Sequence, residues 1–143
     1  MELWGTVRSL TSQVREELKS RIEQISKGIS YSFGVDCQFN FEYGYPVLIN
    51  DLEMTRLVAS ACAKGIGEEN VQILRPSMGG EDFAYYLEKV PGSFFRLGCR
   101  NEEKGIIHPY HSSLFDIDEE VLPFGVEMFV RIIDQYLGLE ITL

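Results

Sequence analysis

The sequence GIIHPYHSSLFDIDEE spans residues 105–120 and runs directly into an apolar segment with helical spacing at residues 121–137. It holds both histidines of the chain, His108 and His111, and it ends in a cluster of acids. A histidine among carboxylates where a loop meets a helix is a setting for metal or acid–base chemistry. Partly exposed loop histidines, followed by acids that cap a helix, explain the same pattern. From these residues alone both interpretations stay open.

The segments around this stretch alternate between helical and extended patterns. The predicted elements are a helix capped by Asn50 and Asp51, a strand at 71–74, a short helix at 81–88, a strand at 93–99 and a helix at 121–137. The last helix has its predicted core stripe at Val126, Phe129, Val130, Ile133 and Leu137. This alternation predicts a mixed α/β fold for residues 47–143.

The first part of the chain has a strand–helix–strand pattern, with strands at 2–10 and 35–43 and a helix between them that begins near Thr11. In the second strand, apolar or aromatic residues alternate strictly with polar ones, which predicts one buried face and one wet face. A helix on one face of a sheet is typical of an open-faced α+β sandwich, of which this unit would be half. The turn residues at 44–46 mark the predicted boundary of this first domain, residues 1–46.

The composition argues against nucleic acids and membranes as partners. The chain has 143 residues and a formal net charge of −9, which disfavours nucleic acid. Its apolar runs are too short to span a bilayer, so no membrane association is predicted. Three scattered cysteines, with no C-x-x-C pair, indicate free thiols in a reducing, cytoplasmic setting.

A second group of residues with possible chemistry is the stretch SMGGEDF at residues 77–83. Paired glycines let a backbone approach a ligand closely, and acids at the following helix start would repel an anion. Those acids suit a structural cap or a hydrogen bond to a metal-binding side chain, and a plain capped turn explains the stretch equally well. Nearby aromatic residues could line an apolar pocket or belong to the core, namely Phe83, Tyr85, Tyr86, Phe94 and Phe95.

Read in order, GTVRSL, YGYPVLIND, PSMGGEDFAYYLEKVPGSFFRLG and HPYHSSLFDIDEEVLPFGVEMF cover nearly the whole chain. They resemble the C-terminal portion of the twentieth metallopeptidase family, which includes aminoacylases, hippurate hydrolases, auxin-conjugate hydrolases and carboxypeptidases. The resemblance implies that residues 1–46 are part of a lid or dimerisation domain. It implies that residues 47–143 are the C-terminal part of an α/β zinc-peptidase-like catalytic domain.

The resemblance also assigns roles to particular residues. It implies that His111 is a ligand of a divalent metal ion (zinc, manganese or similar) in the complete enzyme. It places Gly79, Gly80, Glu81 and Asp82 beside the substrate pocket. The general-base glutamate and the other metal ligands of the family lie in an N-terminal half that this chain lacks. No catalytic residue is therefore predicted here, and the chain alone would bind no metal or bind it incompletely.

Two hypotheses follow. The first is a fragment of a metal-dependent amidohydrolase that cleaves the amide bond of hippurate-like N-acyl amino acids with metal-activated water. The isolated chain would be inactive, and the parent enzyme would form a homodimer through the lid domain. The alternative is a non-catalytic dimerisation or interaction module, in which an unpaired strand edge makes the contact.

Overall fold

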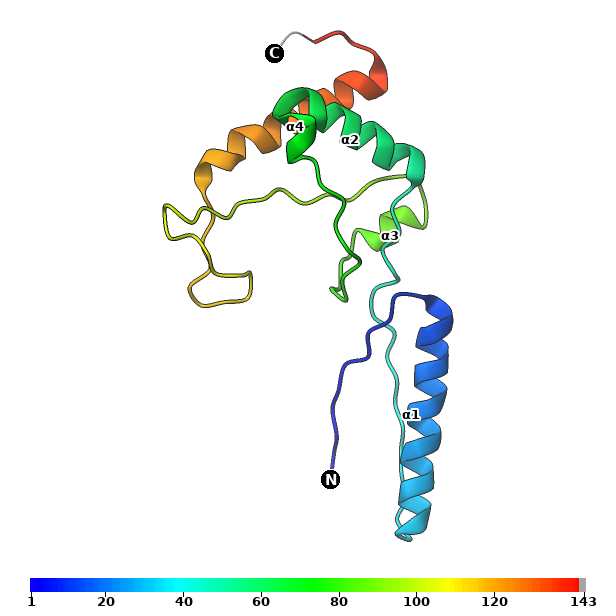
Figure 1. Ribbon diagram of the computed structural model, residues 1–143. Coiled ribbons are helices and arrows are strands. Elements are labelled where there is room, and N and C mark those ends of the chain that lie inside the picture. Colours follow the sequence, from blue (N-terminus) through cyan, green and yellow to red (C-terminus); the bar gives the residue numbers. More distant parts are fainter. Residues whose placement is uncertain (142–143) are drawn as a thin grey trace. The chain divides into compact units, whose positions relative to one another are not determined.

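The computed structural model describes residues 1–141, and its regular secondary structure is almost entirely helical (Figure 1). Its helices are α1 (Ser12–Ser32), α2 (Leu52–Ile66), α3 (Ala84–Leu87) and α4 (Leu122–Leu137), with short 3₁₀ helices η1 (Glu68–Asn70) and η2 (Glu119–Val121). The chain divides into two compact units. Unit 1 comprises Met1–Ile49 and Leu74–Val90, and unit 2 comprises Asn50–Ile73 with the described residues from Pro91 onward.

In unit 1, α1 begins at a side-chain cap and the chain then returns beside it (Figure 1). The hydroxyl of Thr11 accepts a hydrogen bond from the backbone N–H of Val14 at 3.1 Å, as expected of an N-cap residue. On the returning segment, the Tyr43 hydroxyl accepts from Lys19 Nζ at 2.9 Å and donates to Glu16 Oε2 at 2.6 Å. These contacts attach residues 35–43 to one side of α1.

The predicted strands at 2–10, 35–43, 71–74 and 93–99 are wrong as strands in this structure, since none of them is paired within the described residues 1–141. The β-pairing described there is one isolated antiparallel bridge between Asn101 and Ile106. Alternating side chains describe the two faces of an extended chain, but a strand also needs a neighbour that completes its backbone hydrogen bonds. The helical part of the predicted fold class is therefore confirmed, and the mixed α/β class is not.

The alternation in residues 35–43 nevertheless predicts which side chains are covered. Cys37, Phe39 and Phe41 are half-buried, whereas the intervening polar residues are exposed. The ammonium group of Lys19 lies over the ring of Phe41, 5.7 Å from its centroid. The two-faced pattern is thus present without a sheet, because α1 covers one side of the extended segment.

In unit 2, α2 and α4 pack against each other around a small core. Ala61, Cys62 and Met128 are buried there. A Cβ atom added to Gly65 would lie 2.5 Å from Cε of Met128, so the glycine permits the two helices to approach closely. Burial also raises the pKa of the Cys62 thiol, which keeps it protonated and apolar in character.

The predicted core stripe of α4 is largely wrong. Val126, Phe129, Ile133 and Leu137 are each at least half exposed, and Met128 is the side chain that α4 buries most completely. The helix is apolar around much of its circumference, and α2 covers only one side of it. Periodicity finds the apolar residues of such a helix but cannot tell which of two apolar faces has a neighbour.

Asn50 and Asp51, which the sequence predicted to cap α2 together, have different roles in the structure. Asp51 is the N-cap, because its Oδ1 accepts from the backbone N–H of Met54 at 2.9 Å. Asn50 instead pairs with the backbone of Phe94, donating to its carbonyl and accepting from its N–H, both at 2.8 Å. Asn50 thereby joins the beginning of α2 to the segment that follows Pro91.

Replacing Asp51 with alanine should lower the free energy of unfolding by about 1 kcal/mol, because an N–H at the start of α2 loses its acceptor. Asp51→Asn is the matched control, since asparagine caps helices about as well as aspartate and is expected to retain most of the stability. Urea denaturation followed by circular dichroism measures both variants. Equal losses in the two variants would contradict the assigned cap.

Candidate functional site

The loop that carries both histidines begins and ends at one place in unit 2. Before the loop, Asn101 and Ile106 exchange backbone hydrogen bonds of 3.0 and 2.8 Å across a tight turn. Gly105 lies in that turn with a φ of 73°, a left-handed conformation that glycine adopts without strain. After the loop, the backbone N–H of Asp118 donates to the carbonyl of Cys99 at 3.0 Å. Residues 107–117, here called the histidine loop, are therefore closed at the neck.

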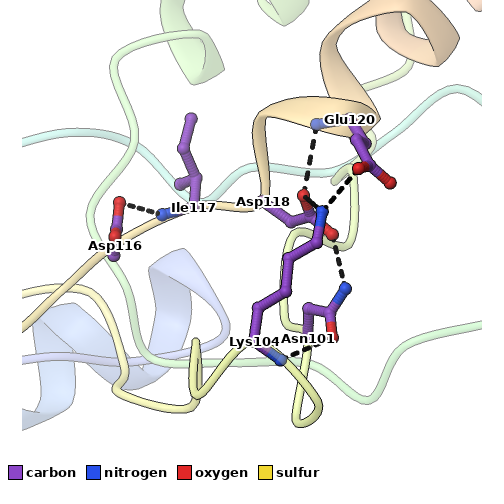
Figure 2. A network of polar contacts seen from close by, with 6 residues as sticks. All are labelled: Asn101, Lys104, Asp116, Ile117, Asp118 and Glu120. Atoms are coloured by element: carbon purple, nitrogen blue, oxygen red, sulfur yellow. Dashed lines mark hydrogen bonds and ion pairs between the residues drawn. The ribbon is translucent and has the colours of Figure 1, made fainter.

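Side chains reinforce this neck (Figure 2). The carboxylate of Asp118 accepts from Lys104 Nζ at 2.7 Å and from Asn101 Nδ2 at 2.6 Å. It also accepts from the backbone N–H of Glu120 at 3.2 Å, which caps η2. Lys104 makes a second ion pair with Glu120 at 2.7 Å. These four residues, Asn101, Lys104, Asp118 and Glu120, are called the neck cluster below.

The two ion pairs of Lys104 differ in their surroundings. The side chain of Asp118 is 10 % exposed, whereas that of Glu120 is 79 % exposed. Water and salt screen exposed pairs strongly, so the pair with Glu120 contributes little. The contact between Lys104 and Asp118 is therefore the main electrostatic link across the neck.

Both charges of this link persist at neutral pH. The hydrogen bond from Lys104, followed by that from Asn101, lowers the pKa of Asp118 below its usual 3.8. The hydrogen bonds to Asp118 and Glu120 raise the pKa of Lys104 above its usual 10.5. A lowered carboxylate pKa stabilises the folded state above pH 3.8, and this effect disappears only as the pH falls through the folded pKa. The lysine contribution is complete below pH 10.5 and disappears as the pH rises through its raised pKa.

Within the histidine loop, His111 has a φ of 68°, in the left-handed region. Its ring meets that of Tyr110 edge to face, with centroids 5.0 Å apart. A turn closed by Ser112 N–H to Pro109 O at 3.2 Å contains it, and a second turn, closed by Phe115 N–H to Ser112 O at 3.1 Å, follows. Both histidines are exposed. The metal-ligand role of His111 remains a prediction.

The second predicted group, Gly79, Gly80, Glu81 and Asp82, lies in an irregular segment of unit 1 that ends in a turn into α3. Arg8 Nη1 donates to the carbonyl of Met78 at 3.0 Å, and this hydrogen bond holds the residue that precedes Gly79. A Cβ atom on Gly80 would lie 3.2 Å from the ring of Tyr45, so a larger residue would have to displace that ring. The placement of this turn beside a substrate pocket remains a prediction.

Lys104 and Asn101 were not singled out from the sequence. The stretch NEEKG at 101–105 has the composition of a turn, which was the one available signal. Nothing in the local pattern links Lys104 to an acid fourteen positions later. The link exists because the tight turn and the start of η2 meet at the neck of the loop.

Comparison with known proteins identifies the family. The model of peptidase family M20/M25/M40 matches residues 5–135. The chain belongs to this family. This confirms the resemblance derived from the sequence motifs. No helix in the described part of the chain has the length and apolar character needed to cross a membrane.

Individual relatives in the M20 family fit this assignment. Thermostable carboxypeptidase 2 of Saccharolobus solfataricus is 40 % identical over 125 residues, which cover 87 % of this chain and 31 % of that protein. N-acetyl-L-cysteine deacetylase of Bacillus subtilis is 38 % identical over 120 residues, covering 82 % of this chain and 27 % of the deacetylase. The chain thus spans about a third of the length of the curated relatives it matches.

A solved structure from methicillin-resistant Staphylococcus aureus, described as an aminohydrolase, shares the fold. It matches with a TM-score of 0.75 and 31 % identity over 89 % of this chain and 32 % of its own. Large parts of that chain and of the curated relatives therefore have no counterpart in these 143 residues.

M20 enzymes generally depend on divalent metals. Among residues 1–141, no three or more His, Cys, Asp or Glu side chains lie together in a way that could hold a metal ion. A zinc site needs at least three protein ligands. The described residues do not form a metal centre by themselves, and His111 could supply one ligand at most.

Proposed function

We propose that this chain is the C-terminal portion of a metal-dependent amidohydrolase that hydrolyses the amide bond of N-acyl amino acids. The observation that carries the proposal is the family match across residues 5–135. One relative is a deacetylase of N-acetyl-L-cysteine and another is a carboxypeptidase, and both reactions break an amide bond at an amino acid. The shared chemistry is attack of water on an amide carbonyl.

In this proposal His111 contributes one ligand to a metal site whose other ligands, with the general base, come from sequence outside this chain. A divalent ion bound there would polarise the scissile carbonyl and lower the pKa of a bound water. Gly79, Gly80, Glu81 and Asp82 border the pocket for the substrate. No catalytic step is assigned to the residues of this chain, because they supply neither the base nor a complete metal site.

The exposed side of α4 supports the proposal that further protein packs here. Val126, Phe129 and Ile133 are 66 %, 60 % and 50 % exposed, and they follow one another at spacings of three and four residues on a single face. A helix with a continuous apolar stripe ordinarily buries it against another element. The remaining two-thirds of an M20 protein would be large enough to cover it.

The purified 143-residue chain should not hydrolyse N-acetyl amino acids, with or without added zinc or manganese. The physical reason is that a metal-dependent hydrolase needs its base and its full ligand set to activate water. The measurement is release of the free amino acid over hours at neutral pH, with a complete M20 relative as the positive control. Metal-dependent hydrolysis by the isolated chain would contradict its assignment as an incomplete enzyme.

An interaction module is the second candidate, and the unpaired extended segments of unit 1 favour it. Residues 35–43 are attached to α1 on one side and have no strand neighbour within the described residues 1–141. An exposed edge of this kind can pair with a second chain. Homodimerisation through residues 1–46 and a cytoplasmic location belong to the proposal as well. Light scattering tests the pairing: the chain should be a dimer and Asn40→Pro a monomer, whereas a monomeric wild-type chain would contradict it.

A further inference from the structure

We propose that Lys104 and Asp118 are positioning residues for His111, acting by closing the neck of the histidine loop. This inference rests on the proposed function for its purpose, since a loop of fixed shape matters only if His111 has a task. Whether Lys104 and Asp118 fix the shape of the histidine loop does not depend on that function and can be tested on the isolated chain.

One group of residues closes the histidine loop at both ends. Asn101 pairs with Ile106 through its backbone and with Asp118 through its side chain. Lys104, from the same tight turn, reaches the same carboxylate (Figure 2). The two ends of the histidine loop are thus joined through Asp118. Closing a loop restricts the conformations available to everything between its ends.

The closed loop contains an uncommon backbone conformation at His111. A residue other than glycine with φ of 68° is uncommon, and sparsely populated backbone conformations cost on the order of 1–3 kcal/mol. Such a conformation persists only where the surrounding structure imposes it. His111 is exposed, and its described ring contact is with its neighbour Tyr110. Local turns hold the backbone around His111, and the neck fixes the ends of the loop that carries those turns.

Lys104 is the residue whose removal opens the neck most directly. Asp118 is almost buried and accepts hydrogen bonds through both carboxylate oxygens. Without the ammonium group, a nearly buried carboxylate would lose its only charged partner in the neck cluster. The favourable response is for the turn and the start of η2 to separate, which lets water reach Asp118.

The test is nuclear magnetic resonance of the full 143-residue chain without metal. The chain has only two histidines, so its two imidazole Hε1 signals can be assigned with a His108→Gln variant. In Lys104→Met, the His111 signal should move toward the value of an unstructured histidine. Hydrogen exchange at the neck amides of Ile106 and Asp118 should accelerate at least about tenfold. The amides of α2 and α4 should keep their wild-type protection.

Three variants separate positioning from general stability. Lys104→Arg retains a charged donor and should restore the His111 signal. Asp118→Asn removes the charge from the other side and should reproduce the effect of Lys104→Met. Lys89→Met removes an exposed lysine in unit 1 and should change neither the His111 signal nor the neck amides.

Several results would overturn the inference. An unchanged His111 signal in both Lys104→Met and Asp118→Asn would show that the neck does not control the loop. Global unfolding of both variants, with loss of protection in α2 and α4, would make the neck cluster a general stabiliser. A different result would contradict only the metal-ligand role of His111. In that case the His111 signal responds to the neck variants, but removing His111 leaves metal binding by an assembled enzyme unchanged.

Discussion

Met128→Ala is expected to lower the free energy of unfolding of unit 2 by about 2–5 kcal/mol. Met128 is 1 % exposed and is the largest fully buried side chain among the described residues. It lies against α2, where a Cβ atom on Gly65 would fall 2.5 Å from its Cε, and Ala61 and Cys62 of the same helix are also buried. Truncation would remove apolar contacts and leave a cavity that two rigid helices cannot close completely.

The effect should be large because the core is small. Native domains are typically stable by about 5–15 kcal/mol, so a loss of this size is a large part of the total. Urea denaturation followed by the helical circular dichroism signal gives the difference. Met128→Leu conserves volume and should cost less than about 1.5 kcal/mol.

Val126→Ala is the matched control for this prediction. Val126 lies on the same helix and is 66 % exposed, so its truncation should change the stability of the isolated chain by less than about 0.5 kcal/mol. Equal losses in Met128→Ala and Val126→Ala would mean that the exposed face of α4 is already covered in the isolated chain. That result would contradict the assignment of the α2–α4 contact as the core of unit 2.

The second large effect concerns His111 in an assembled enzyme. We expect a chimera, in which this chain replaces the matching segment of the Saccharolobus carboxypeptidase, to hydrolyse amide substrates when a divalent metal is present. His111→Ala in that chimera should lower kcat/KM at least about 100-fold. Metal polarisation of a carbonyl is worth several kcal/mol, and each 1.36 kcal/mol corresponds to about a factor of ten in rate.

His108→Ala is the control for this experiment, because His108 shares the loop and the exposure of His111. It should lower kcat/KM less than about threefold, since its imidazole is not expected to reach the metal. Atomic emission measurement of bound metal distinguishes a lost ligand from a misfolded loop, and His111→Ala should release metal in proportion to the lost activity. Equal losses of kcat/KM in the two histidine variants would contradict the metal-ligand role of His111.

The helices were accessible from sequence because their signals are local. Thr11 and Asp51 cap the next turn of their own chain, and Gly34 and Gly138 supply the left-handed conformations that accompany helix ends. The predicted helix at 121–137 agrees with α4 to within one residue at its start. The motif pattern also indicated the family whose model matches residues 5–135.

Other features depended on which segments meet. Strand pairing requires a second chain segment at hydrogen-bonding distance, so the alternation in 35–43 predicted a covered face but not a sheet. Asn50 looked like a cap, yet its amide pairs with Phe94, far along the chain. The buried face of α4 was decided by the position of α2, which covers Met128 and leaves the Phe129 stripe exposed.

By itself, the sequence determined the helices, the family and the composition of the histidine loop, all of which depend on residues close together in the chain or on motif order. Only the tertiary structure decided that Asp118 closes that loop with Lys104 and Asn101. The physical reason is that an ion pair forms wherever folding brings opposite charges within about 4 Å, and helical or strand periodicity carries no information about that distance.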